Sequence, residues 1–160
     1  MNKSICAAAL LAGASIALGG CDSGEETAGS EANAGLAGLE VQNARLALPA
    51  VSGNPAAIYF DLVNTSDKNY AIRKAEVKGA GKTEVHGSME WSGEMTMGET
   101  GPQTVQAGET LKFEPDGLHV MVFDLSPDLQ SGGTTEMTLT VAGGKTATFP
   151  VTIQAAGEDR

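Results

Sequence analysis

The sequence predicts an all-β domain of the sandwich or barrel class, and three observations support this. From Leu39 onward, short apolar stretches alternate with polar residues, which is typical of half-buried strands. Turn residues separate these stretches, as in Ala142-Gly143-Gly144-Lys145. No segment has the apolar spacing of an amphipathic helix. Many short strands joined by Gly-rich turns indicate a sandwich or a barrel.

Each expected strand follows from its own local pattern. Apolar residues partly alternate in 39–48, 56–64 reads AAIYFDLVN, and 70–77 alternates around Ile72. The breaks at 49–55 and 64–69 contain the Pro, Gly, Asn and Asp residues that favour turns. Seven further strands are expected at 82–89, 94–97, 104–106, 110–113, 119–125, 135–142 and 146–154.

The N-terminus predicts export. Residues 1–20 carry one positive charge and then a short apolar run, which is typical of a signal peptide. The run ends in Leu18-Gly19-Gly20-Cys21, which resembles a bacterial lipoprotein box and implies an acylated Cys21. Asp22 resembles an inner-membrane retention signal. The alternative is an ordinary secretory signal followed by a chance cysteine.

Composition divides the rest of the chain. Residues 21–38 are rich in Gly, Ala, Ser and Glu, so we expect the acylated cysteine and a flexible tether there. Residues 39–154 are expected to form one domain, and 155–160 a short tail. We expect a periplasmic protein that is lipid-anchored, with the inner membrane favoured.

Charge and cysteine content exclude several classes of function. The formal net charge is −10, so nucleic acid and anionic lipid head groups are poor partners, whereas a cation or a basic protein face suits the surface. Cys6 leaves with the signal peptide, so Cys21 has no partner for an internal disulfide. A blue-copper electron-transfer site is also excluded, because it needs a thiolate from the domain.

Soft metal ligands are concentrated between residues 85 and 121. This stretch holds both histidines and four of the six methionines: His86, Met89, Met95, Met97, His119 and Met121. Ten residues separate His86 from Met97, twenty-one separate Met97 from His119, and one separates His119 from Met121. Two imidazoles with two thioethers favour copper(I), because polarisable sulfur prefers a soft monovalent ion.

This spacing resembles the periplasmic copper chaperone family associated with the copper A centre of cytochrome c oxidase, whose signature is H-x10-M-x21-H-x-M. The resemblance includes Gly93 and the segments AGETLKF (107–113) and EPDGLHVMVFDL (114–125). Two departures are Asp116, which separates the usual proline and glycine, and the small pair Gly87-Ser88 after the first histidine. The resemblance implies a Greek-key, cupredoxin-like β-sandwich that binds copper(I) through His86, Met97, His119 and Met121.

Strand geometry predicts how these ligands point. Side chains alternate between the two faces of a strand. If Val120 and Val122 face the core, His119 and Met121 project together from the other face, about 6.5 to 7 Å apart. Val85 would then point inward and His86 outward. A hairpin turn at 90–93 would bring His86 and Met97 toward each other.

Other residues keep more than one interpretation. Met89 and Met95 could contact the metal secondarily, serve as entry ligands or only pack at the rim. Met137 alternates with Leu139 and Val141 and is expected in the core. Trp91 is expected to be a partly exposed turn residue, with metal shielding or partner contact as alternatives. A lone surface histidine is usually only solvated.

We therefore expect a periplasmic metallochaperone that carries one copper(I) per chain, since the C-terminal residues printed here include no further His or Met. Its expected acceptor is the copper A subunit of cytochrome c oxidase or an assembly factor that loads it. The alternatives are a copper buffering or tolerance protein and a metal-free interaction module. We expect a monomer and no enzyme, because no paired-carboxylate, Ser-His-Asp or Cys-His arrangement is present.

Overall fold

The computed structural model describes residues 36–158, and the side chain of Trp91 is not among the described parts. The predictions for the signal peptide, Cys21, Asp22 and the tether up to residue 35 therefore lie outside the described residues. The described residues form ten strands: β1 (Leu39–Ala47), β2 (Ala56–Asn64), β3 (Tyr70–Val77), β4 (Ala80–Trp91), β5 (Glu94–Glu99), β6 (Gln103–Val105), β7 (Thr110–Phe113), β8 (His119–Leu125), β9 (Thr134–Val141) and β10 (Thr146–Gln154).

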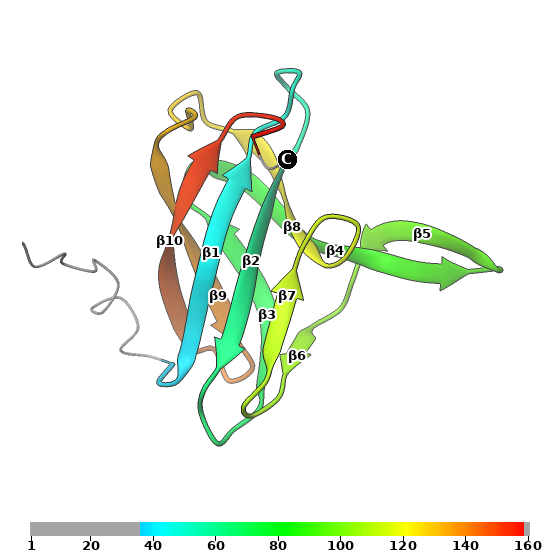
Figure 1. The fold of residues 1–160 in the computed structure, drawn as a ribbon, viewed down its shortest axis with the longest axis vertical. Helices are drawn as coiled ribbons and strands as arrows, with labels where there is room; N and C mark the ends of the chain where they lie inside the picture. The colour runs from blue at the N-terminus through cyan, green and yellow to red at the C-terminus, as the bar shows by residue number, and fades with distance from the viewer. Residues whose placement is uncertain (1–35, 159–160) are drawn as a thin grey trace, which may run out of the picture.

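The strands form one continuous hydrogen-bonded sheet. Its order is β5-β4-β8-β2-β1-β10-β9-β3-β6, and β7 pairs with the part of β2 that β8 leaves free. Only the pair of β1 with β10 is parallel among these ladders. The sheet curls so that β9 and β3 lie behind β1 and β2 (Figure 1). The all-β prediction is confirmed. No helix in residues 36–158 is long and apolar enough to cross a membrane.

The core lies between the two layers and is formed by alternate residues of their strands. In β2 the residues Ile58, Phe60 and Leu62 are buried while their neighbours are only half-buried. Phe60 stacks on Phe113 of β7 with 4.1 Å between ring centroids. Met137 of β9 is fully buried, which confirms its predicted place in the core.

Leu36, three residues before the predicted start of the domain at 39, already packs into the core. Leu36 is 1% exposed and its carbonyl accepts a hydrogen bond from the Leu39 amide. Gly38 has a positive φ of 81°, and a Cβ there would lie 2.8 Å from the Cβ of Ser66. The sequence did not indicate this contact, because a single leucine after a Gly- and Ala-rich stretch has no periodicity to mark it.

The β4–β5 hairpin projects from the body of the domain (Figure 1). Both strands are longer than predicted, because pairing continues from Trp91 opposite Glu94 to His86 opposite Glu99. Ser92 and Gly93 form the two-residue loop with positive φ values of 55° and 84°, as a type I′ turn requires. This turn sets the register that places the predicted ligand of β5, Met97, near the predicted ligand of β4, His86.

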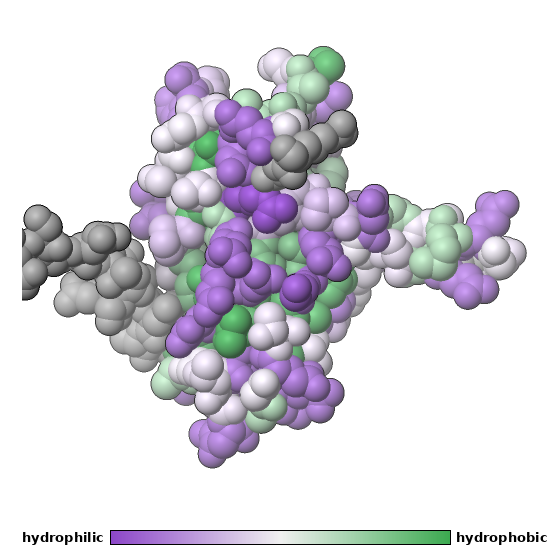
Figure 2. Space-filling view, viewed as in Figure 1, coloured by the Kyte–Doolittle hydropathy of each residue, from purple (hydrophilic) through white to green (hydrophobic). Residues whose placement is uncertain are grey.

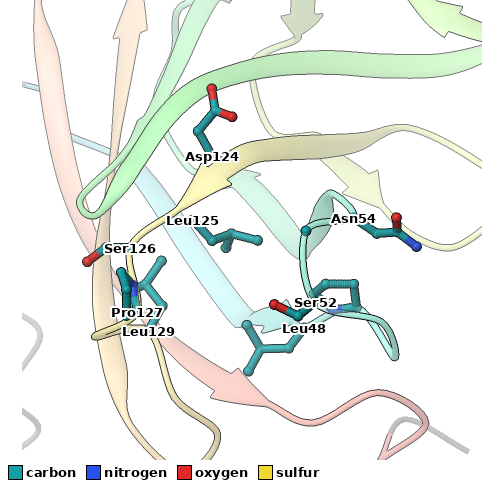
Figure 3. A pocket seen from close by; sticks show the side chains of 10 residues that line it. Leu48, Ser52, Asn54, Asp124, Leu125, Ser126, Pro127 and Leu129 are labelled. Carbon is teal, nitrogen blue, oxygen red and sulfur yellow. The ribbon is translucent and has the colours of Figure 1, made fainter.

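A hollow opens at one end of the domain between the 48–54 segment and the end of β8, and Figure 3 shows the side chains that line it. The lining includes Leu48, Asn54, Asp124, Leu125 and Leu129. No imidazole or thioether is among its described lining residues. It is therefore separate from the predicted copper ligands.

Candidate metal centre

Strand register places the four predicted ligands on one face of the sheet. His86 of β4 lies directly opposite His119 of β8, and Glu84 lies opposite Met121. On the other side of β4, Ser88 lies opposite Met97 of β5. Directly opposed residues in antiparallel strands point to the same face, and so do residues two apart on one strand. The four side chains therefore project together.

The opposite face of β8 packs into the core, as the alternation predicted. Val120 and Val122 are completely buried, while Met121 between them is half-buried. Val85 of β4 is partly buried and packs against the core, and His86 projects to the other side. Burial of the valines thus fixes the direction in which His119 and Met121 point.

The two imidazoles are neighbours. Their ring centroids are 5.9 Å apart with an interplanar angle of 47°. Because a metal ion lies about 2 Å from each imidazole nitrogen that binds it, this separation leaves room for one ion between the rings. His119 is only 8% exposed and has the Tyr59 ring 6.2 Å from its own. His86 is more accessible, with 19% of its side chain exposed.

The thioether side of this face is open to solvent. Met97 is 47% exposed, and its sulfur lies 3.9 Å from the Ser88 hydroxyl. Met97 is two residues from Glu99, which pairs with His86, so it lies diagonally across from His86 at a backbone separation of about 7 to 8 Å. A thioether on a flexible methionine side chain can span such a separation.

The other two methionines of the hairpin lie on different faces. Met95 pairs with Glu90, which puts it on the same face as Met97, and it is 69% exposed. Met89 pairs with Thr96 and projects from the opposite face. A Cβ at Gly98 would lie 2.9 Å from the terminal methyl of Met89, so this side chain packs over the glycine. Figure 2 shows a pale green, weakly hydrophobic patch on the projecting hairpin, with purple, hydrophilic residues at its tip.

The turn before β8 positions His119. The Glu114 amide donates to the Leu118 carbonyl at 2.7 Å, and the Gly117 amide donates to the Glu114 carbonyl at 3.1 Å. Asp116 takes a positive φ of 63°, a conformation that aspartate tolerates better than most residues. Ser88 donates to the Asp116 carbonyl at 2.9 Å and joins this turn to the hairpin.

Close packing accounts for the small residue at position 87. Gly87 is buried on the face opposite His86, and a Cβ there would lie 2.9 Å from Leu118 and 3.1 Å from Thr100. A larger residue would push the hairpin away from the turn before β8. The absence of a side chain at Gly87 therefore allows Leu118 to pack against the base of the β4–β5 hairpin.

A charged group that the sequence analysis did not select lies beside the histidines. Glu84 contacts Nε2 of His86 at 2.7 Å through one carboxylate oxygen and pairs with Lys82 through the other. Hydrogen bonds from Lys82 and His86 hold the pKa of Glu84 below its usual range, and the bond to Glu84 raises the pKa of Lys82. The sequence did contain a signal for this contact. Lys82, Glu84 and His86 are spaced two residues apart, so on a strand their side chains lie on the same face.

The donor set restricts which metal fits. Within residues 36–158, His, Cys, Asp and Glu side chains form no group of three or more that could hold a metal ion. An ion between the two imidazoles would complete its coordination with the thioethers on the same face. Sulfur and imidazole ligands without thiolate or a carboxylate cluster favour a soft monovalent ion over hard divalent ones.

Comparison with known proteins places the chain in a family. Residues 39–153 match the family model described as "Putative lipoprotein LpqE-like". The chain belongs to the LpqE-like lipoprotein family. One relative, "Putative lipoprotein Lxx21020" of Leifsonia xyli subsp. xyli, is 26% identical over 115 residues, covering 71% of this chain and 69% of the relative.

Two solved structures resemble this LpqE-like domain. CuI-DR1885 from Deinococcus radiodurans is 26% identical, with a TM-score of 0.60 and coverage of 79% of this chain and 85% of that one. The copper-bound PCuAC domain from PmoF2 is 17% identical, with a TM-score of 0.62 and coverage of 77% and 97%. Together with the observed topology, they confirm the predicted cupredoxin-like β fold.

Proposed function

We propose that this protein binds one copper(I) ion per chain through His86, Met97, His119 and Met121. The observation that carries the proposal is the arrangement of these four side chains on one sheet face, with the imidazoles 5.9 Å apart. The similarity to the CuI-DR1885 structure supports it. Met95 lies on the same face and is the candidate for a secondary contact, whereas Met89 packs over Gly98 on the other face.

The proposed biological role is that of a metallochaperone. Neutral imidazole and thioether ligands leave the bound ion its positive charge, so a thiolate-rich acceptor competes well for it. Met97, at 47% exposed, lies where an acceptor's ligand can replace it first, while buried His119 holds the ion longest. The proposed acceptor is the copper A site of cytochrome c oxidase or a protein that loads it. This role requires no enzymatic step.

The proposed location is the periplasmic side of a membrane, with the chain held by an acylated Cys21 and the inner membrane favoured by Asp22. Membership of a lipoprotein family supports an anchor. Replacing Cys21 with serine should move the protein from the membrane fraction to the soluble fraction of cells. Retention of Cys21→Ser in the membrane would contradict the lipid anchor.

Copper(I) titration against a chromophoric chelator under reductant tests the binding proposal. We expect one equivalent to compete with the chelator, and His86→Ala and Met121→Ala to weaken binding by at least about tenfold, which corresponds to about 1.4 kcal/mol. Met89→Leu is the matched control, since it removes a hairpin thioether from the opposite face. Absence of competition, or equal affinities in all four proteins, would reject the site.

The phenotype of cells lacking the protein distinguishes a role in copper delivery from a role in copper buffering. A chaperone predicts defective cytochrome c oxidase assembly when copper is scarce and recovery when copper is added. A buffering protein predicts sensitivity to excess copper with normal oxidase assembly. The second outcome would retain the copper site but remove the proposed acceptor.

A further inference from the structure

Each imidazole of the candidate centre has one nitrogen engaged by an oxygen acceptor. Nε2 of His86 lies 2.7 Å from a carboxylate oxygen of Glu84. Nδ1 of His119 lies 3.0 Å from the carbonyl oxygen of Gly117. The two rings are therefore held through opposite nitrogens, one by a charged side chain and the other by the backbone.

The chemistry of the acceptors fixes where the ring protons lie. A carbonyl oxygen and an ionised carboxylate can only accept hydrogen bonds, so the nitrogen that faces each must carry the proton. The second oxygen of Glu84 pairs with Lys82, and only 15% of the Glu84 side chain is exposed, so the carboxylate is anchored on both sides. In the neutral rings, the lone pair is left on Nδ1 of His86 and on Nε2 of His119.

We propose that Glu84 is a positioning residue of the metal centre, which keeps the proton of His86 on Nε2 so that copper(I) binds Nδ1 of His86 and Nε2 of His119. The inference rests on the proposed copper function and adds the binding atoms to it. A metal-bound histidine commonly donates its other ring N–H to a carboxylate or a backbone carbonyl, which fixes the tautomer and the ring orientation. Here Glu84 and Gly117 supply these two acceptors.

The position of Glu84 suits a second effect on the same ion. It lies directly opposite Met121 across the β4–β8 ladder and two residues from His86 on the same face. Its negative charge therefore adjoins two of the four ligands without occupying a ligand position. A nearby anion stabilises the cationic centre. Because the carboxylate is already held by Lys82 and His86, little conformational entropy is lost when the metal binds.

Glu99 provides a matched control. Glu99 belongs to β5 and pairs with His86 from the side of β4 that faces away from β8. Its side chain is exposed and lies on the same sheet face as that of His86. Glu99→Ala removes the same charge from the face as Glu84→Ala does. The conservative variant Glu84→Gln removes the charge but keeps an oxygen acceptor, so it separates hydrogen bonding from electrostatics.

The first measurement is made without metal, by long-range proton–nitrogen NMR at mildly alkaline pH. We expect a single Nε2–H tautomer for His86 and a single Nδ1–H tautomer for His119. Glu84→Ala should convert His86 alone to a tautomer mixture, whereas Glu84→Gln and Glu99→Ala should retain Nε2–H. A His86 tautomer that is insensitive to Glu84→Ala would overturn the positioning role.

The second measurement identifies the bound nitrogens. Copper(I) is added to the wild-type protein, and silver(I), a soft monovalent ion with a magnetic nucleus, is added to a parallel sample to reveal nitrogen–metal coupling. We expect coupling at Nδ1 of His86 and Nε2 of His119. Glu84→Ala should weaken copper(I) affinity about 10- to 100-fold, and Glu99→Ala by less than about threefold.

The outcomes separate this inference from the proposed function. Metal coupling at Nε2 of His86 would overturn the inference and leave the copper function intact, because Glu84 would then be displaced by the ion. No binding of either ion, with the metal-free tautomers as expected, would reject the copper function and with it the assigned binding atoms. This wild-type measurement decides the binding atoms even if Glu84→Ala fails to fold.

Discussion

At the scale of single residues, the candidate centre depends on polar atoms that hold the histidines in place. His119 receives its orientation from the Gly117 carbonyl, and His86 from the Glu84 carboxylate. Asp116 makes the first of these contacts possible, because its left-handed conformation closes the turn that brings Gly117 back toward His119. The ligands themselves are thus only part of what the site requires.

The pH dependence of stability should contain a contribution from Glu84. The pKa of Glu84 in the folded protein is held below its ordinary value, because Lys82 and His86 donate hydrogen bonds to the charged form. Its stabilising effect is therefore fully present above about pH 4.5 and is lost as the pH falls through the lowered pKa. In urea unfolding of the metal-free protein, wild type should be more stable than Glu84→Gln near neutral pH, and this difference should shrink in acid.

Glu99→Gln is the control for this titration, since it also removes one carboxylate from the same sheet face. Its stability difference from wild type should change less with pH than that of Glu84→Gln. A constant difference between wild type and Glu84→Gln down to strongly acidic pH would mean that folding does not lower the pKa of Glu84.

At the scale of elements, the register of three strands decides which side chains meet. The β4–β8 ladder places His86 against His119, and the β4–β5 hairpin places Met97 diagonally from His86. A one-residue slip in the hairpin would move Met97 to the other face, since side chains alternate along a strand. The Ser92-Gly93 loop and the packing over Gly87 and Gly98 hold that register.

The side chain of Asn64, at the end of β2, joins the loop that follows β2 to the loop that follows β6. Its side chain is 1% exposed and donates to the carbonyls of Lys68 at 2.7 Å and Gln106 at 2.9 Å. Asn64→Ala leaves these partly buried carbonyls without their donor, so we expect a loss of about 1 to 3 kcal/mol in the free energy of unfolding. Urea denaturation measures this loss.

Copper(I) affinity provides the second measurement on the same variant. Asn64 lies at the end of β2 away from residues 56–58, which are the ones that pair with β8, so Asn64→Ala should bind copper(I) as wild type does. Asn54→Ala, at an exposed loop asparagine, should leave both stability and affinity unchanged. A large loss of affinity in Asn64→Ala would show coupling between the two ends that the register does not explain.

At the scale of the whole molecule, the candidate centre joins strands that are far apart in the sequence. Its ligands come from β4, β5 and β8, and the unfolded chain does not hold these segments together. An ion that binds only the folded arrangement must stabilise it by mass action. Metal binding and folding are therefore linked even though the core itself is apolar.

We expect copper(I) to stabilise the fold by about 2.7 kcal/mol when the free ion is at one hundred times its dissociation constant. Thermal unfolding under reductant at buffered free copper(I) measures this as a higher Tm. Met121→Ala should show a smaller rise at the same free copper(I), because its dissociation constant is larger. An unchanged Tm for wild type would contradict binding to the folded state.

Local periodicity allowed much of the fold to be predicted. Alternation in β8 and β9 gave both the strands and their buried faces, because a sheet that packs on one side forces apolar residues to every second position. The predicted directions of His119 and Met121 followed from the same rule. Strand ends were less accurate, because pairing with β5 extends β4 beyond its own alternating pattern.

The sequence by itself therefore determined the all-β class, the strand order along the chain and the spacing of the soft ligands, since each is written in neighbouring residues. Only the tertiary structure decided that Leu36 enters the core, that His119 is nearly buried and that Met89 and Met95 face opposite ways. It also decided which nitrogen of each imidazole is engaged. These features depend on how the sheet curls and how its strands pair, and such contacts between distant segments leave no periodic pattern in the sequence.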